Sequence, residues 1–170
     1  MALPPLVVMG VSGSGKTTVG QGIAERVDGA VFIDADDLHP ASNVEKMRSG
    51  LALTDADRAP WLDAVGRAMR EATRAGSTPV VACSALRRAY RTRILAAEPA
   101  AFFVLLDVDH DELDRRLRAR RHHYMPASLL DSQLATLERL GPDEPGVAVP
   151  VDGPASDVVD AVLGRVLDRR

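Results

Sequence analysis

The sequence predicts an α/β protein in which a five-stranded parallel sheet lies between two layers of helices. Three observations predict this fold. Five short apolar runs have the length of buried strands, helical patterns separate them, and a glycine-rich loop joins the first run to the first helical pattern. Because strands that alternate with helices are joined by right-handed crossovers, we expect a parallel sheet whose strands are covered on both faces.

The runs and the helical patterns define the elements in order. The expected strands are Leu6–Met9, Ala30–Ile33, Pro79–Cys83, Ala101–Leu106 and Val147–Val151. The expected helices are Thr17–Val27, Arg58–Ala75, Arg88–Ala97, Asp111–Arg121, Pro126–Leu140 and Ser156–Arg169. Two segments are longer than plain crossovers require. We interpret residues 37–75 as a substrate-binding insertion and residues 115–140 as a lid region.

The bulk composition indicates one domain over residues 1–170. The chain is 46% hydrophobic, carries a net charge of −3 and has one cysteine, Cys83, which fits a reducing cytoplasm and excludes an internal disulfide framework. This charge gives no general attraction to nucleic acid or to anionic membranes. The start MALPPLVVMG lacks a basic n-region, and no apolar stretch approaches the ~20 residues that span a bilayer. We therefore expect a cytoplasmic protein that binds neither nucleic acid nor a membrane.

The loop GVSGSGKT has the pattern G-x-x-x-x-G-K-[ST], which follows a strand and opens a helix. Its backbone N–H groups and the helix N-terminus bind phosphates, while Lys16 reaches the β- and γ-phosphates and assists catalysis. The Thr17 hydroxyl can ligate Mg²⁺. The pattern predicts a P-loop NTPase fold that binds ATP and Mg²⁺. The expected nucleotide-binding residues in this segment are Gly10, Ser12, Gly13, Ser14, Gly15, Lys16, Thr17 and Thr18.

Two carboxylates, Asp34 and Asp36, follow the second expected strand. Ligands of parallel sheets collect at the carboxyl ends of the strands, so both can face the phosphate loop. Phosphoryl transfer needs one carboxylate near Mg²⁺ and another that orients the acceptor hydroxyl and accepts its proton. The alternative is that Asp36 or Asp37 caps the next helix.

The acceptor is expected to lie against the segment that follows. His39, Lys46 and Arg58 are its candidate substrate-binding residues, because a planar guanidinium can bind a carboxylate or a phosphate. Alternatively, Arg58 pairs with Asp55 or Asp57 at the surface. We expect Trp61 to belong to the core.

Small residues end the third strand, and arginines follow them. They leave room for a ligand beside the phosphate loop, where Ser84, Arg87 and Arg91 are candidate substrate-binding residues. Cys83 is expected to be a small buried residue and not a nucleophile.

A further run of arginines lies at positions 115, 116, 118, 120 and 121. It is interpreted as a lid that closes over ATP, although a solvated face or a nucleic-acid patch would have the same composition. His122 and His123 lack metal-ligand spacing and are interpreted as lid or surface residues.

The combination of these motifs resembles the small P-loop gluconokinases, which are related in fold to shikimate and adenylate kinases. The stretches that carry the resemblance are DADDLHPASNVEKMRSGLALTDADRAPWL, VVACSALRRAYR and RRHHYMPASLLDSQLATLE, together with the phosphate loop. The DDLHP, DRxPWL and ACSAL patterns are far more specific than the phosphate loop alone. The chain departs from the family at Ala35, where Gly is frequent, and at Arg87, where Lys is frequent.

The resemblance implies ATP-dependent phosphorylation of the C6 hydroxyl of D-gluconate by a homodimer. It implies that Asp36 is the base, that Asp34 supports Mg²⁺, and that Arg58 binds the sugar-acid carboxylate. Arg116 and Arg120 would contact the nucleotide, with Arg120 or Arg121 nearest the transferred phosphate.

The loop at Pro154 would lie along the adenine ring, although an Asp-Gly-Pro turn with Ser156 as a helix cap explains its residues equally well. Two rival functions stay open at this point. One is a kinase of the same fold that acts on another polyol acid such as shikimate, and the other is a non-catalytic nucleotide sensor.

Overall fold

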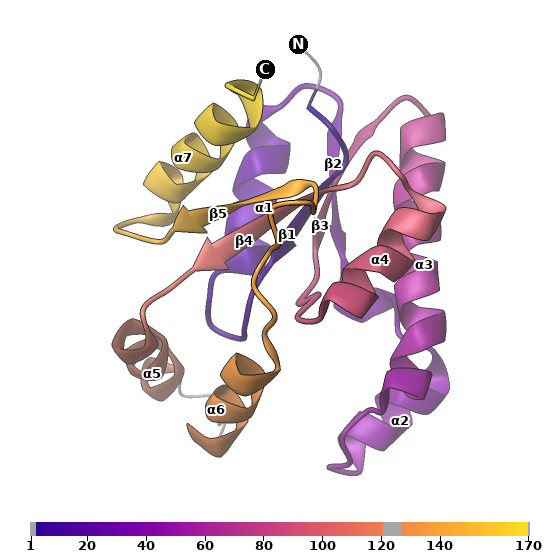
Figure 1. Ribbon diagram of the computed structural model, residues 1–170, viewed down its shortest axis with the longest axis vertical. Coiled ribbons are helices and arrows are strands. Elements are labelled where there is room, and N and C mark those ends of the chain that lie inside the picture. The colour runs from indigo at the N-terminus through magenta and orange to yellow at the C-terminus, as the bar shows by residue number, and fades with distance from the viewer. Residues whose placement is uncertain (1–2, 121–126, 170) are drawn as a thin grey trace.

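The computed structural model describes residues 3–120 and 127–169. Its five strands form one parallel sheet in the order β2-β3-β1-β4-β5 (Figure 1). The strands are β1 (Leu6–Met9), β2 (Ala30–Asp34), β3 (Thr78–Ala82), β4 (Phe102–Asp107) and β5 (Gly146–Pro150). All five predicted strands are confirmed, with ends that differ by at most one residue.

The order of the strands places a switch in direction at β1. From β1 the chain runs outward to β2 and returns to β3, and then crosses to β4 on the other side. Ligands of open parallel sheets bind beyond the carboxyl ends of the strands at such a switch. The central strands β1, β3 and β4 are almost wholly buried, whereas the edge strands β2 and β5 are partly exposed. The prediction that strands are covered on both faces therefore holds for the central strands only.

Helices cover both faces of the sheet (Figure 1). On one face, α1 and α7 pack against the side chains of Leu6 and Val8. On the other face, α3 and α4 pack against Val7 and Met9, as expected for a strand whose side chains alternate between faces. The helices of these two layers are α1 (Lys16–Arg26), α3 (Asp55–Arg74), α4 (Arg88–Ala97) and α7 (Ala155–Leu167).

Helix α3 begins three residues before its predicted start. Thr54 and Asp57 form a capping box, in which each side chain accepts the other residue's backbone N–H. Between β2 and α3 the chain forms two short helices that the sequence analysis did not predict, η1 (Ala35–Leu38) and α2 (Ala41–Arg48).

Helices α5 (His110–Ala119) and α6 (Ala127–Thr136) lie apart from the two layers, beyond the end of β4 (Figure 1). They share a small core with the phosphate loop, made by Val11, Leu86, Leu113, Leu117 and Leu130. Helix α6 is shorter than predicted. Arg121, His122 and His123 lie outside the described residues, as do the predictions made for them. No described helix has the length and apolar character needed to span a membrane.

Candidate active site

The phosphate loop connects β1 to α1 at the switch point, as the motif predicted. Gly10, Gly13 and Gly15 have positive φ values of 148°, 83° and 94°. At Gly10, a Cβ atom would lie 2.9 Å from Ser14 Oγ and 3.3 Å from the Leu106 carbonyl oxygen. Glycine is therefore required for both conformation and space at this position.

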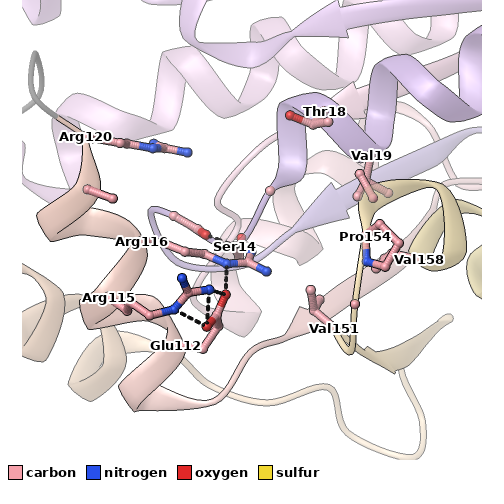
Figure 2. Close-up of a pocket in the computed structure, with 15 residues that line it drawn as sticks. Ser14, Thr18, Val19, Glu112, Arg115, Arg116, Arg120, Val151, Pro154 and Val158 are labelled. Atoms are coloured by element: carbon pink, nitrogen blue, oxygen red, sulfur yellow. Dashed lines mark hydrogen bonds and ion pairs between the residues drawn. The ribbon is translucent and has the colours of Figure 1, made fainter.

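A cavity of about 500 Å³ lies on one side of this loop (Figure 2). Predicted nucleotide-binding residues line it from the phosphate loop, α1, the end of α5 and the loop before α7: Gly13, Ser14, Gly15, Thr18, Arg116, Arg120 and Pro154. Arg116 donates to Glu112 at 2.7 Å and to the Gly13 carbonyl at 3.3 Å. Arg115 and Glu112 also line the cavity and were not named as nucleotide-binding residues. The sequence shows a run of arginines but does not show which of them face the cavity or which carboxylate pairs with them.

The Pro154 loop forms the far wall of this cavity. Helix α7 begins at Ala155 with Pro154 at the cap position, and the Ser156 hydroxyl donates to Asp157 instead of capping the helix. The capping alternative for Ser156 is therefore wrong.

A second cavity, of about 530 Å³, lies on the other side of the loop. The predicted residues that line it come from distant parts of the chain: Ser12, Lys16, Thr17, Asp34, Asp36, His39, Arg58 and Ser84. Lys16 Nζ donates to the Val11 carbonyl at 3.0 Å, and burial lowers the pKa of Lys16 from its ordinary value, an effect that nearby Arg120 adds to. The loop thus separates two cavities and contributes to both.

Asp34 and Asp36 are adjacent at the floor of the second cavity. The Asp34 carboxylate accepts the Asp36 backbone N–H at 3.0 Å and so caps η1, a role that the sequence analysis had weighed for Asp36 or Asp37. Partial burial of the Asp36 carboxyl raises its pKa, and the negative charge of Asp34 raises it further. A carboxylate with a raised pKa is better suited to accept a proton than an ordinary aspartate.

His39 and Trp61 form a wall of this cavity. Their rings stack with centroids 4.2 Å apart, and Trp61 donates from Nε1 to the Ala35 carbonyl at 2.7 Å. Trp61 is buried as predicted and also reaches the cavity. Burial lowers the pKa of His39, so its ring is neutral at neutral pH and offers one donor and one acceptor.

Arg58 is held at the cavity by several oxygen atoms. It donates to the Leu53 carbonyl at 2.7 Å and to the Tyr90 hydroxyl at 3.4 Å, and lies 3.8 Å from Asp55. Tyr90 in turn donates to Asp55 at 2.5 Å. The alternative that Arg58 pairs with Asp55 is therefore confirmed, but the Arg58 side chain also lines the cavity.

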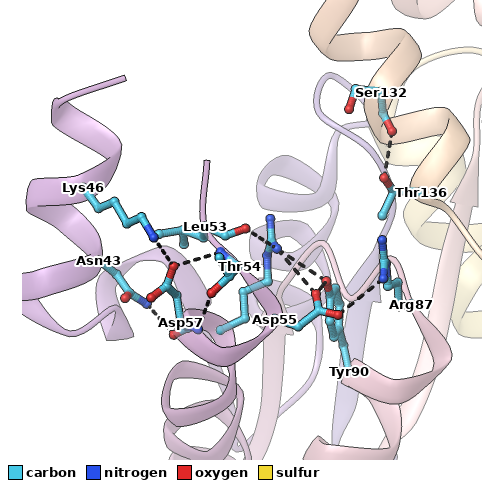
Figure 3. A network of polar contacts seen from close by, with 11 residues as sticks. Asn43, Lys46, Leu53, Thr54, Asp55, Asp57, Arg87, Tyr90, Ser132 and Thr136 are labelled. Carbon is cyan, nitrogen blue, oxygen red and sulfur yellow. Dashed lines mark hydrogen bonds and ion pairs between the residues drawn. The ribbon is translucent and has the colours of Figure 1, made fainter. Parts of the chain in front are cut away.

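Three other predicted substrate-binding residues do not line this cavity. Lys46 pairs with Asp57 at 2.6 Å, an interaction that lowers the pKa of Asp57 to about 2, and Arg87 pairs with Asp55 at 3.3 Å. Both pairs are drawn in Figure 3.

For Arg91 the prediction of substrate contact is wrong. Its side chain is fully buried, binds both carboxylate oxygens of Glu144 at 2.6 and 2.9 Å, and donates to the Ala85 carbonyl at 3.0 Å. This contact lowers the pKa of Glu144. Arg91 therefore supports the loop that carries Ser84. An arginine that follows a strand end has no sequence signal that tells whether its partner is a ligand or a distant carboxylate.

Cys83 lies beside Lys16 at the floor of the second cavity, and its burial raises the pKa of the thiol to about 12. The thiol therefore stays protonated, as expected for a buried residue that is not a nucleophile. Gln133 of α6 also lines the cavity and was not predicted.

A phosphate loop that separates two cavities, with paired carboxylates at one strand end, defines a P-loop kinase. A family model described as an AAA domain matches residues 6–140. A gluconokinase of Gluconobacter oxydans is 53% identical over 151 residues, covering 88% of this chain and 84% of that protein. The crystal structure of a gluconokinase from Sinorhizobium meliloti is 43% identical, with a TM-score of 0.82, and covers 96% of this chain and 91% of that one. This chain belongs to the gluconokinase family.

A shikimate kinase from Acinetobacter baumannii is also similar, with a TM-score of 0.59, and covers 99% of this chain and 96% of that one. At 18% identity this similarity shows the fold alone.

Proposed function

We propose that the protein transfers the γ-phosphoryl group of ATP to the C6 hydroxyl of D-gluconate, giving 6-phospho-D-gluconate and ADP. The observation that carries this proposal is the pair of cavities on either side of one phosphate loop. In-line transfer requires donor and acceptor to approach the moving phosphoryl group from opposite sides. The nucleotide occupies the arginine-lined cavity and gluconate the cavity that contains Asp36.

The reaction relies on positioning and on charge. The loop N–H groups hold the phosphates, and Lys16 neutralises charge that develops on the transferred group. Asp36 orients the acceptor hydroxyl and accepts its proton, for which its raised pKa suits it. Arg120 lines the nucleotide cavity and adds positive charge on that side.

Gluconate is bound by groups on α3, η1 and the end of β3. Arg58 offers a fixed guanidinium to the carboxylate of the sugar acid, while His39 and Ser84 offer hydrogen bonds to its hydroxyls. Lys46 and Arg87 do not line the cavity and instead pair with Asp57 and Asp55 of α3. We therefore propose that they hold α2, α3 and α4 in place.

Thr17 and Asp34 are proposed to hold Mg²⁺. Both are hard oxygen donors that line the same cavity as Lys16. No cluster of three or more metal-ligating side chains occurs within residues 3–120 and 127–169, which fits an ion held mainly by phosphates and water. When bound, the ion neutralises charge on the phosphates. Residues 115–140 are proposed to act as a lid over the nucleotide.

A coupled assay of ADP release with gluconate, shikimate, glycerate and AMP tests the function. We expect turnover with gluconate alone. Asp36→Asn is expected to lower kcat by roughly 10²- to 10⁴-fold, the range of a general base. Asp37→Asn is the matched control, because Asp37 follows Asp36 but does not line the cavity. Turnover with shikimate but not gluconate would contradict the substrate, and ATP binding without any turnover would favour a sensor.

A homodimer is proposed from the family resemblance, and a cytoplasmic location from the composition of the chain. Light scattering on the purified protein tests the first, because a mass near one chain of 18.2 kDa would contradict it. Cell fractionation tests the second.

A further inference from the structure

The side chain of Gln133 connects α6 to the phosphate loop. The Ser12 backbone N–H donates to Gln133 Oε1 at 2.7 Å, and Gln133 Nε2 donates to Ser12 Oγ at 3.3 Å. One carboxamide thus binds both the backbone and the side chain of a residue that lies 121 positions away in the sequence. Both hydrogen bonds are partly shielded from water, so they restrain the loop more than exposed bonds would.

Ser12 and Gln133 both line the gluconate cavity, together with Lys16 and Asp36. They therefore line the cavity in which gluconate is proposed to receive the phosphoryl group. Gln133 Nε2 carries two hydrogens, and among the described residues only Ser12 Oγ accepts one of them. The other hydrogen is available to an oxygen atom in the cavity.

Helix α6 is a firm support for this side chain. Leu130 of α6 is buried with Val11 of the phosphate loop in one small core. Just beyond the helix, the Glu138 backbone N–H donates to the Leu86 carbonyl at 2.8 Å, and its carboxylate accepts the Arg88 N–H at 2.9 Å. A positioning group needs such packing, because its own rotamer must be fixed.

We propose that Gln133 is a positioning residue for phosphoryl transfer. Its oxygen holds Ser12, and with it the acceptor side of the phosphate loop, in the arrangement that transfer requires. Its second N–H is left to donate to the acceptor. Gln133 acts on the step that joins the two substrates and has little part in holding ATP, whose cavity it does not line. This role rests on the proposed gluconokinase activity.

Steady-state kinetics on four single variants and one double variant tests the role. Gln133→Leu removes both hydrogen bonds, and Gln133→Glu keeps the shape and an acceptor but removes the N–H donor and adds charge. Ser12→Ala removes only the hydroxyl that Gln133 contacts. Ser132→Ala is the matched control, an exposed neighbour on α6 that lies outside both cavities.

For both Gln133 variants we expect kcat with gluconate to fall roughly tenfold to a hundredfold, the cost of a small misplacement. The KM for ATP is expected to stay within about twofold of the parent value, since ground-state binding of ATP is not affected. The double variant Ser12→Ala/Gln133→Leu should lose no more than Gln133→Leu alone, because the two groups act through one contact. Ser132→Ala should match the parent.

Three outcomes would overturn the role. The kcat could be unchanged in both Gln133 variants, or the KM for ATP could rise by the same factor by which kcat falls. Thermal denaturation could also show that the loss of kcat comes from unfolding of the variants. An inactive parent enzyme would instead contradict the gluconokinase activity itself, so the two failures are distinguishable.

Discussion

The two cavities beside the phosphate loop are built in different ways. The phosphate-binding part of the nucleotide side depends mainly on backbone: glycines with positive φ, the N-terminus of α1 and a turn at Pro154. Arg116 and Glu112 add a side-chain pair beside it. The gluconate side depends on side chains from α3, α4 and α6 that restrain one another, as Arg58, Tyr90 and Asp55 do. The first can be recognised from a local pattern, and the second arises only when distant segments pack together.

This difference has a consequence for mutational sensitivity. Changes on the nucleotide side act through conformation at single residues, so their effects should remain local. Changes on the gluconate side act through partners, so one substitution can release several groups.

Arg91→Met should lower the free energy of unfolding by about 3–5 kcal/mol, because it leaves the Glu144 carboxylate buried without its partner. It also removes the donor to the carbonyl of Ala85, the residue that has a positive φ of 44°. Urea denaturation measures the loss. Where the variant folds, the KM for gluconate should rise, because Ser84 precedes Ala85.

The double variant Arg91→Met/Glu144→Leu distinguishes the contribution of the ion pair to stability from that of side-chain packing. Removal of both charges should restore part of the stability, since the desolvated carboxylate is gone. A double variant that is as unstable as Arg91→Met would show that packing, and not charge, is the cause.

Gly10→Ala should raise the KM for ATP by roughly tenfold to a hundredfold, which corresponds to about 1–3 kcal/mol of local strain. The added Cβ meets Ser14 and the Leu106 carbonyl, and φ is unfavourable for alanine. The KM for gluconate should change little. Gly164→Ala in α7 is the control, because nothing lies within 4 Å of its added Cβ. A similar rise in both KM values for Gly10→Ala would remove the contrast between the two sides.

The strand–loop–helix arrangement of the phosphate loop could be predicted from the sequence, because its motif states both the residue types and their spacing. The five strands could be predicted for a related reason: a buried strand is a short apolar run such as Leu6–Met9. The helix α2 was missed because it is short and polar, and its stability comes from contacts such as Asn43 with the Asp57 carbonyl.

On the gluconate side the sequence predicted which residues are polar but not which polar groups pair. Asp36, His39 and Arg58 line the cavity, whereas Arg91 forms an ion pair with Glu144, 53 positions away. Gln133 was missed for the same reason, since a lone glutamine on a helix carries no signal until its partner Ser12 is known.

Arg58→Lys should raise the KM for gluconate by roughly tenfold while the KM for ATP stays constant. Lysine keeps the charge but has no planar fork, so a single ammonium nitrogen would have to serve the Leu53 carbonyl, Tyr90 and a substrate carboxylate. The loss of one hydrogen bond to a charged group costs about 1.5–3 kcal/mol, so the rise is at least of this order. Steady-state kinetics with each substrate varied in turn measures both constants. An equal rise for ATP would place Arg58 outside the gluconate site.

The smallest effect concerns His110, which joins the start of α5 to Asp131 of α6 at 3.2 Å. The Asp131 carboxylate raises the pKa of His110, and Asp111 and Asp114 add to the effect. A pKa that is higher in the folded state stabilises the fold below about pH 6.5, and this contribution is lost as the pH rises through the raised value. The melting temperature of His110→Gln should therefore fall below that of the parent at pH 5.5 and match it at pH 8.5. Because the pair is exposed, high salt should reduce the difference at pH 5.5. A difference that is independent of pH would mean that His110 joins α5 to α6 as a neutral hydrogen-bonding group.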